Sequence, residues 1–374
     1  MFGELARVQD QDSGKVQAAA MTAAPPASAQ GSGQPPHPRP ATNIDTVHEL
    51  LCGSNAGIDA ISLNGTPVPL GDAPDEALAR FDIPSNKTQL WRILNAATDA
   101  FLDLTVSDQN GRPLPLKVLA RDGSPLADDT GKPLPLEETL ESQAVPPSGR
   151  IEFLLQAPPA GTRAYLVTHA VDTGCAGDRL PERRLAVITN EGAVTASGPP
   201  PDPTPTLRKN LFSGLLQKHT EHRRVIAMAE YPRPGVSDQV DFYIVERKPG
   251  AVLHPYHMGD APAITVTAGT TEEWTIENWT NELHTFHIHQ LQFRVLEVDG
   301  EPVTNPPLLD VVTVPYATAT GYHSKEGPVR PGRVRVKLTF PGSLAGDIPF
   351  HCHLVDHEDN GMMAVLRVLP AGRH

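Results

Sequence analysis

Cysteine is scarce in this chain of 374 residues, which contains only Cys52, Cys175 and Cys352. Three cysteines exclude the dense disulfide framework that holds many small secreted domains together. Two interpretations of the first pair remain open: Cys52 and Cys175 form a disulfide with each other, or both are buried free thiols. Under either interpretation Cys352 has no cysteine partner, so its role has to be sought among its neighbours in the sequence.

Long apolar runs and an excess of positive charge are also missing. No apolar run reaches the ~18 residues that a membrane-spanning helix requires, so we expect no membrane span. Lys and Arg number 31 against 44 Asp and Glu, for a net charge of −13, which argues against nucleic acid or an anionic membrane surface as the main partner. The sequence as given begins without an apolar stretch or a small-residue cleavage site, so we expect no signal peptide there.

Aromatic residues make up only 5% of the chain, whereas proline and glycine are frequent, with 39 and 30 residues. Average usage of these two types together is about 12%. The composition therefore favours short strands joined by many turns over a helical bundle. Residues 12–45 are rich in Ala, Ser, Gly, Gln and Pro, and residues 197–210 are rich in Pro; both stretches are predicted linkers or loops.

Between these linkers the chain alternates apolar and polar residues with the two-residue period of β-strands. The alternation runs through residues 102–106 and 151–155, and turn signals such as Asn110-Gly111 and Asp122-Gly123 separate the strands. We therefore predict one all-β sandwich or barrel over residues 58–196. Residues 1–57 before it are predicted to hold a residual strand and the low-complexity linker.

The second half of the chain repeats this organisation. After a linker over residues 197–221, whose last part (210–221) is a candidate short helix, we predict a second all-β domain over residues 222–374. Its expected strands include residues 273–278, 286–298, 333–340 and 363–369. The predicted fold class is thus all-β, with two consecutive domains preceded by a disordered or linker segment.

Two short segments concentrate residues that bind transition metals. They contain His284, His287 and His289 in the first segment and His351, Cys352, His353, His357 and Met362 in the second. An isolated His-x-His pair is more often a packing or surface feature than a metal site, but two such pairs beside a Cys-x4-His-x4-Met pattern indicate metal binding. The His-x-x-His pairs that start at His219 and His254 have no such companion, so we assign both to loops.

The second segment supplies a thiolate, an imidazole and a thioether from Cys352, His357 and Met362. With one more imidazole this is the ligand set of a blue-copper centre, in which two His and one Cys bind the metal and a Met is a weak axial ligand. Zinc requires four strong ligands and gains little from Met, so copper is favoured. Met363 is the alternative axial ligand, but the spacing favours Met362.

Strand geometry sorts the remaining histidines, because successive side chains of a strand point to opposite faces. In an extended segment around Cys352, the cysteine faces one side while His351 and His353 face the other. His287 and His289 share a face, and His284 lies on the opposite one. We therefore expect two metal centres on either side of one sheet edge, with Cys352 covalently linked to ligands of the second centre.

Residues 271–278, 284–295 and 350–363 resemble the third domain of a multicopper oxidase of the laccase-like, three-cupredoxin-domain type. The resemblance implies that residues 222–374 form a copper-binding, cupredoxin-like Greek-key β-sandwich. It implies ligands of a mononuclear type 1 copper at His284, Cys352, His357 and Met362. It also implies a type 2 copper ligand at His287 and type 3 copper ligands at His289, His351 and His353. Thr285 departs from the family, which usually has Pro at this position.

Glu358 directly follows His357 and matches an acidic residue that in several family members delivers protons towards the oxygen-reducing copper cluster. A carboxylate suits this role, because the reduction of O2 to water consumes protons. A solvated loop charge is an equally good interpretation of the sequence. Cys352 and Glu358 are therefore the candidate catalytic residues.

Residues 61–188 resemble the family's second domain more loosely, through residues 63–69, 90–96 and 117–125. In the family this domain binds no copper, and the sequence holds no ligand cluster here. The resemblance implies a second cupredoxin-like sandwich that positions its neighbours. It also implies a periplasmic or extracellular location, because family members are usually exported.

The family's trinuclear copper cluster takes further histidines from two His-x-His pairs of a first domain. Upstream of residue 58 this sequence has only His37 and His48, so the resemblance implies a partial type 2/type 3 cluster. Residues 1–5 are similar to the closing strand of the family's first domain. We therefore expect a multicopper oxidase without its first domain, either truncated or genuinely shortened, with the missing histidines supplied by a separate chain or domain.

The leading functional prediction is a copper-dependent oxidoreductase that takes single electrons from a small-molecule or metal-ion donor at a type 1 copper and reduces O2 to water at the trinuclear site. The alternative is a non-enzymatic copper-binding or electron-transfer module that a separate chain completes, and a third possibility is a structural relic without copper. Phenols, aryl amines and low-valent metal ions are donors for family members. With six methionines and no Met-rich insert, the sequence slightly disfavours a specialist for cuprous ions.

Overall fold

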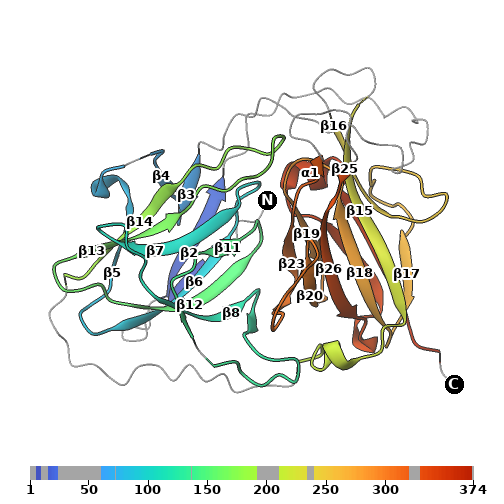
Figure 1. Ribbon diagram of the computed structural model, residues 1–374, viewed down its shortest axis with the longest axis horizontal. Coiled ribbons are helices and arrows are strands. Elements are labelled where there is room, and N and C mark those ends of the chain that lie inside the picture. Colours follow the sequence, from blue (N-terminus) through green and yellow to red (C-terminus); the bar gives the residue numbers. More distant parts are fainter. Residues whose placement is uncertain are drawn as a thin grey trace.

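The computed structural model describes residues 6–9, 16–23, 60–71, 73–135, 137–191, 210–233, 240–319 and 329–372. Two β-lobes lie side by side, one built from β1–β14 and the other from β15–β28 (Figure 1). Each lobe contains two large sheets, so the prediction of an all-β fold with consecutive sandwich domains is confirmed. Within the described residues, no helix is both long enough and apolar enough to span a bilayer.

The N-terminal lobe has a nine-stranded and a five-stranded sheet. The first has the order β10-β8-β12-β6-β1-β2-β3-β4, with β9 paired to β8. Its strands are β1 (Ala6–Gln9), β2 (Val16–Ala23), β3 (Ile61–Leu63), β4 (Thr66–Val68), β6 (Thr88–Asn95), β8 (Leu116–Arg121), β9 (Ser124–Pro125), β10 (Glu138–Thr139) and β12 (Arg150–Gln156). The second sheet has the order β11-β7-β13-β14-β5. Its strands are β5 (Ala79–Asp82), β7 (Leu102–Asp108), β11 (Gln143–Val145), β13 (Arg163–Thr168) and β14 (Arg183–Thr189), and the 3-10 turn η2 (Asp75–Ala77) precedes β5.

Strands β1 and β2 lie in the segment for which the composition predicts a residual strand and a linker. They pair with each other in antiparallel register, and β2 continues the sheet by pairing with β3. Part of the stretch assigned to the linker, Val16–Ala23, is therefore strand. The rest of residues 12–45, residues 192–209 of the second linker, Cys52 and residues 1–5, which resemble a closing strand, lie outside the described residues. The proposed domain boundaries stay predictions.

The C-terminal lobe has a seven-stranded sheet, a five-stranded sheet and a small ribbon. The first sheet has the order β16-β15-β18-β26-β20-β21, with β22 paired to β20. Its strands are β15 (His222–Pro232), β16 (Val240–Glu246), β18 (Thr271–Asn278), β20 (Phe293–Val298), β21 (Glu301–Pro302), β22 (Leu308–Leu309) and β26 (Gly332–Thr339). The second sheet, β17-β28-β27-β19-β23, contains β17 (Ile264–Thr267), β19 (His284–Ile288), β23 (Val311–Val314), β27 (Gly346–Cys352) and β28 (Met363–Leu369). Outside these sheets are the β24 (Thr318–Ala319) and β25 (Val329–Arg330) ribbon, η3 (Leu215–Gln217), η4 (Gly342–Leu344) and the helix α1 (Val355–Asp359).

Two expected elements of the C-terminal half are wrong. The single strand expected over residues 286–298 is two strands, β19 and β20, which belong to opposite sheets. The chain turns between them at Gln290, whose φ is +51°, and the apolar pattern conceals this turn because it continues through Leu291. The short helix expected over residues 210–221 is only the 3-10 turn η3, which begins after a left-handed Gly214 and ends before an extended Lys218.

Aromatic packing fixes the strands that carry the histidine clusters. Trp274 of β18 is fully buried, and its ring centre lies 6.3 Å from that of Phe286 and 5.5 Å from that of Phe350. Phe286 and Phe350 lie on β19 and β27 and point into the sandwich core. Because side chains alternate, His287 and His351 on the same two strands point to the outer face of this sheet.

A loop of the N-terminal lobe packs against the segment that leads into β19. Gly174 forms an isolated antiparallel β-bridge with Glu282, and the Leu283 N–H donates to the Thr173 carbonyl at 2.8 Å. A Cβ on Gly174, whose φ is +92°, would lie 2.1 Å from the Asn281 carbonyl oxygen, so only glycine allows this approach. Cys175 in the same loop is disulfide-bonded, whereas Cys352 is a free thiol. The N-terminal lobe thus positions the start of β19, which begins at His284.

Acidic groups from both lobes lie close together near this contact, so we expect the stability of the fold to depend on pH. Burial, together with the nearby Asp356 and Asp178, raises the pKa of Asp99 to about 6, although a hydrogen bond from Thr98 opposes the shift. The folded state then holds the proton more tightly than the unfolded chain, so Asp99 favours folding at low pH. We expect this contribution to be lost as pH rises from about 4 through about 6.

Chemical denaturation at a series of pH values tests this expectation. The variant Asp99→Asn should flatten the fall in unfolding free energy between these pH values, because a neutral amide does not ionise there. Superimposable pH profiles of the variant and the original protein would contradict the assignment of this effect to Asp99.

Candidate metal centre

The first cluster brings together a thiol and two imidazoles. His284 begins β19, Cys352 ends β27 and His357 lies on the short helix α1. The Cys352 Sγ lies 3.6 Å from His284 Nδ1 and 3.8 Å from His357 Nδ1, and the two Nδ1 atoms are 3.0 Å apart. All three side chains are buried, so three potential ligand atoms face one another in a space shielded from water.

Neighbouring side chains determine which ring nitrogens face the thiol. In the tautomer that carries its proton on Nε2, His284 donates to Thr280 Oγ1 at 2.8 Å and His357 donates to Glu282 Oε1 at 3.2 Å. Both Nδ1 atoms are therefore left with a free lone pair. The Phe242 ring stacks on the His357 ring with centres 4.2 Å apart. Hydrogen bonds that orient ligand imidazoles in this way are typical of protein metal sites.

The protonation states in this cluster follow from its burial. Desolvation lowers the pKa of His357 to about 3, and desolvation with the nearby His357 lowers that of His284. Both rings are thus neutral, as ligands must be. Burial raises the pKa of the Cys352 thiol to about 12, so in the absence of a cation the sulfur stays protonated. A metal ion would supply the positive charge that a buried thiolate requires.

Met362 is the fourth residue that the sequence assigns to this centre. It is fully buried, whereas Met363 is partly exposed and begins β28. The Met362 N–H donates to the His357 carbonyl at 2.8 Å, and the Cys352 N–H donates to the Met362 carbonyl at 3.0 Å. The backbone thus holds Met362 directly beside His357 and Cys352, and burial favours it over Met363.

The second cluster gathers four imidazoles on the outer face of the same strands. His287 and His351 are directly opposed in the β19–β27 register. The ring centre of His287 lies 5.2 Å from that of His289, 5.3 Å from His351 and 5.4 Å from His353. His289 Nε2 is 3.1 Å from His351 Nε2. The structure thus brings together the histidines that strand parity places on this face.

Two rings of the second cluster donate through Nδ1 to backbone carbonyls, which leaves their Nε2 atoms available as ligands. The His287 Nδ1–H donates to the Asp310 carbonyl at 2.8 Å, and the His351 Nδ1–H donates to the Cys352 carbonyl at 2.9 Å. Burial, with the neighbouring imidazoles, lowers the pKa of His287 to about 3 and also lowers that of His353. The buried His353 Nδ1 has no hydrogen-bond partner among the described residues. A metal ion would satisfy this atom, so the donor set fits one.

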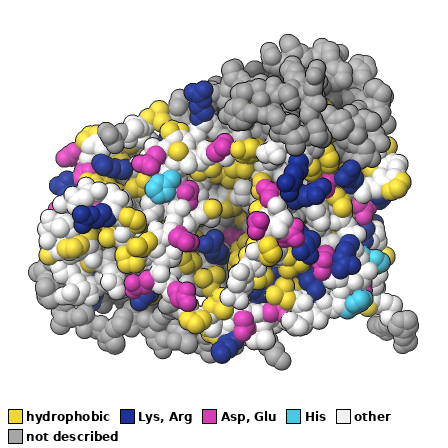
Figure 2. Space-filling view, viewed as in Figure 1, with side chains coloured by type: hydrophobic (Ala, Val, Ile, Leu, Met, Phe, Trp, Pro, Cys, Tyr) yellow, Lys and Arg dark blue, Asp and Glu magenta, His cyan; other side chains and the backbone are white. Residues whose placement is uncertain are grey.

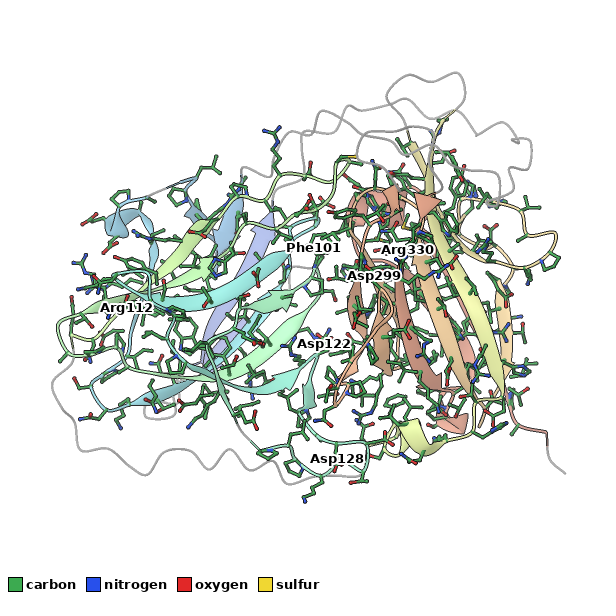
Figure 3. The ribbon with its side chains drawn as sticks, in the orientation of Figure 1. Phe101, Arg112, Asp122, Asp128, Asp299 and Arg330 are labelled. Carbon is green, nitrogen blue, oxygen red and sulfur yellow. The ribbon has the colours of Figure 1, made fainter. Side chains whose placement is uncertain are left out.

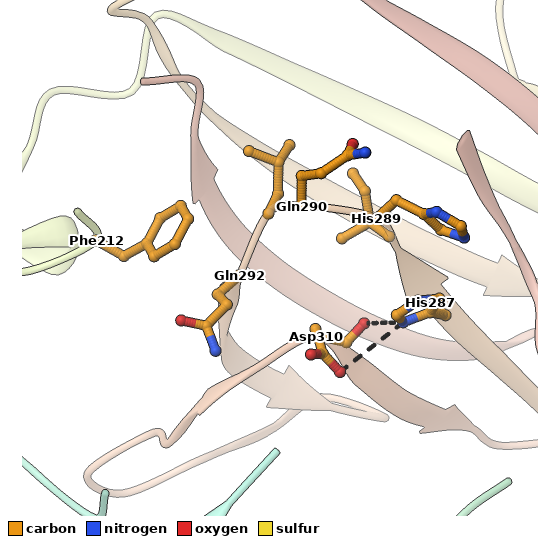
Figure 4. Close-up of a pocket in the computed structure, with 8 residues that line it drawn as sticks. Phe212, His287, His289, Gln290, Gln292 and Asp310 are labelled. Carbon is orange, nitrogen blue, oxygen red and sulfur yellow. Dashed lines mark hydrogen bonds and ion pairs between the residues drawn. The ribbon is translucent and has the colours of Figure 1, made fainter. Parts of the chain in front are cut away.

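A pocket of about 420 Å³ opens beside this second cluster. In Figure 4 the rings of His287 and His289 lie at one end of it, and Phe212 lies at the other. Its lining residues are Phe212, His287, Ile288, His289, Gln290, Leu291, Gln292 and Asp310. Half of the imidazole cluster is therefore reachable from a cavity large enough to admit further side chains.

Glu358 lies next to His351 in the second cluster. One of its carboxylate oxygens is 3.1 Å from His351 Nδ1. Burial pushes the pKa of Glu358 upward, but the hydrogen bond with His351 and the surrounding imidazoles outweigh burial, so the pKa is lowered. With 28% of its side chain exposed, Glu358 links the cluster to solvent.

The N-terminal lobe also supports the second cluster, through residues that sequence patterns did not single out. The guanidinium of Arg150 on β12 donates two hydrogen bonds to the Asp310 carboxylate, of 2.8 and 2.6 Å. The backbone N–H of Arg150 donates to Asp122 Oδ1 at 2.9 Å, and Figure 3 shows Asp122 at the edge of its lobe that faces the other lobe. Because the Asp310 carbonyl holds His287, this interdomain pair supports a candidate ligand.

A family model matches part of the chain. Residues 232–372 match the family model described as Multicopper oxidase. No curated protein matches the chain.

Solved structures give a fold likeness over both lobes. A variant of the McoA multicopper oxidase from Aquifex aeolicus has a TM-score of 0.59 at 18% identity, with 86% of this chain and 62% of that chain covered. A multicopper oxidase from Campylobacter jejuni, described as a metallo-oxidase, has a TM-score of 0.55 at 21% identity, with coverage of 82% and 56%. The laccase-like multi-copper oxidase CueO from Ochrobactrum sp. has 0.57 at 19% identity, with 94% and 66%. This chain thus spans 56–66% of the length of these proteins.

Proposed function

We propose that this chain, whose residues 232–372 belong to the multicopper oxidase family, is a copper-dependent oxidoreductase. In this proposal an electron donor is oxidised one electron at a time at a type 1 copper, and O2 is reduced to water at a type 2/type 3 cluster. The observation that carries the proposal is the pair of histidine clusters on opposite faces of β19 and β27, which share the segment from His351 to His353.

The type 1 ligands in this proposal are His284, Cys352, His357 and Met362. Copper bound there supplies reversible one-electron chemistry. Thr280 and Glu282 fix both imidazoles with Nδ1 towards the sulfur, and the Phe242 ring shields His357. The protein therefore holds the ligands in place before a metal arrives, which limits reorganisation when the charge of the centre changes.

The type 2 ligand in this proposal is His287, and the type 3 ligands are His289, His351 and His353. Cys352 is the residue between two of these, so one peptide segment joins the two clusters. Glu358 holds a carboxylate oxygen beside His351 Nδ1 and would transfer protons from solvent to the cluster. Further histidines, from another domain or a separate chain, would complete the cluster from the side of the pocket that His287 and His289 line.

Copper analysis of the loaded chain tests the type 1 centre. We expect one strongly coloured copper per chain, with an intense visible band from the thiolate–copper pair. Copper uptake without a visible charge-transfer band would overturn this part of the proposal.

Oxygen uptake with a phenolic donor separates an enzyme from the alternative, a copper-binding or electron-transfer module. The pocket beside His287 and His289 favours the module for the chain by itself, since it leaves one side of the second cluster open. Sustained uptake by the isolated, copper-loaded chain would refute the module. The proposed electron donor is a small molecule or a metal ion. The location proposed from the family resemblance is periplasmic or extracellular.

The surface of the chain fits small donors better than a polyanion. On the face shown in Figure 2, acidic side chains are interspersed with Lys and Arg. Several exposed acidic groups are paired across strands, such as Asp347 with Arg367 at 2.6 Å. With a net charge of −13, we propose no nucleic-acid partner.

A further inference from the structure

A third group of potential ligands lies outside both histidine clusters. His254, His257 and Asp260 follow one another on the segment between β16 and β17, and each offers a ligand atom within 4.8 Å of the other two. The sequence pattern alone left the two histidines as loop residues without a companion. The structure supplies that companion in Asp260, one short turn after His257.

Backbone hydrogen bonds close this group into a compact turn. The His257 N–H donates to Asp260 Oδ2 at 2.8 Å, and the Asp260 N–H donates to the His257 carbonyl at 3.0 Å. The same carboxylate oxygen lies 3.8 Å from His254 Nδ1. The two imidazole rings meet edge to face with centres 5.2 Å apart. The carboxylate and both rings thus converge before any ion binds.

The segment is fixed against the loop of the candidate type 1 centre. The Tyr256 N–H donates to the Gly361 carbonyl at 3.1 Å. A Cβ on Gly361, whose φ is +112°, would lie 2.5 Å from Pro255 Cβ. Glycine at this position therefore lets the ligand-bearing turn pack directly on the residue that precedes Met362.

We propose that His254, His257 and Asp260 bind one divalent transition-metal cation at the protein surface. Two imidazoles and a carboxylate suit cations such as Zn²⁺, Ni²⁺ or Cu²⁺, whereas Ca²⁺ and Mg²⁺ prefer oxygen ligands alone. His254 and Asp260 keep 61% and 38% of their side chains exposed, so water completes the coordination. Met258, 92% exposed on the same turn, is a further soft donor for a thiophilic ion.

Zn²⁺ is the appropriate probe, because it is redox-silent and does not depend on oxidase activity. Calorimetric titration of the copper-loaded chain should show one Zn²⁺ equivalent fewer for His257→Ala than for the original protein. The variant Asp260→Asn should weaken the same equivalent at least 10-fold. The matched control is His219→Ala, which removes an exposed histidine of the other His-x-x-His pair and should change nothing. Equal Zn²⁺ stoichiometry in the original protein and His257→Ala would overturn the proposal.

Hydrogen exchange gives a second, local readout. Zn²⁺ should slow amide exchange in residues 254–260 of the original protein and leave it unchanged in His257→Ala. Unchanged exchange in both proteins would also count against the site. The proposal is independent of the copper function: Cys352→Ser should keep this Zn²⁺ equivalent even though it loses the type 1 centre.

Discussion

Replacing Cys352 by Ser is expected to abolish the visible absorption of the copper-loaded protein and to lower its copper content by one ion per chain. The thiolate is the donor of the charge-transfer band in a blue-copper centre, and a hydroxyl does not replace it. His284 and His357 would remain with Nδ1 atoms 3.0 Å apart, but two imidazoles alone hold copper far less tightly than three strong ligands. Absorption spectroscopy and metal analysis on the same samples measure both effects.

A pair of methionine variants provides the control for this experiment. Met363→Leu, at the partly exposed neighbour, should leave the spectrum unchanged, whereas Met362→Leu should keep the colour and shift the band, because an axial thioether tunes the centre without forming it. A Cys352→Ser protein with undiminished copper and colour would show that the sulfur is not a ligand. If copper content is the same before and after the substitution and neither protein is coloured, the structural relic becomes the better interpretation.

The residues that carry the candidate centres were accessible from sequence because they are close together in it. His351, Cys352 and His353 are adjacent, and strand alternation alone puts the cysteine on the side of His284. Thr280, Glu282 and Asp310 orient the imidazoles but form no spacing pattern of their own. Their roles depend on backbone geometry, such as the carbonyl of Asp310 that holds His287, which residue types do not reveal.

The fold too could be predicted from residue patterns only in part. The alternation in residues 333–340 correctly predicted β26, because Val334, Val336 and Leu338 all face the core. The break between β19 and β20 was missed, since a left-handed Gln290 is not a typical turn signal. The pairing of the cysteines was left open by sequence. The structure shows Cys175 in a disulfide, while Cys52 lies outside the described residues.

The ion pairs of Arg150 at the interdomain contact predict a large loss of stability when its positive charge is removed. Its guanidinium lies between two carboxylates, with Asp310 at 2.6 Å and Asp122 at 3.7 Å. Burial, partly offset by Arg150, raises the pKa of Asp122 to about 6, so this acid already ionises reluctantly. Removing the cation would leave both acids without their main positive neighbour.

Arg150→Met is therefore expected to lower the free energy of unfolding by about 2–3 kcal/mol at pH 7. This is below the 3–5 kcal/mol typical of breaking a fully buried ion pair, because 31% of the Arg150 side chain is exposed and solvent screens the loss. Copper retention at the four-imidazole cluster should fall about 10- to 100-fold, as for other losses of groups that orient ligands. Urea denaturation and competition with a copper chelator measure the two quantities.

The matched control is Arg92→Met, which breaks an ion pair with Glu152 inside the N-terminal lobe. It should cost less than about 0.5 kcal/mol, since 44% of the Arg92 side chain is exposed and solvent screens the pair. The double variant Arg150→Met/Asp310→Asn should recover part of the lost stability, because it removes one of the two uncompensated carboxylates. It should not recover copper retention, because the backbone carbonyl at position 310, which holds the His287 ring, would still lack its anchor from the other lobe. Recovery of both quantities together would mean that charge balance, and not the positioning of His287, links the lobes to the cluster.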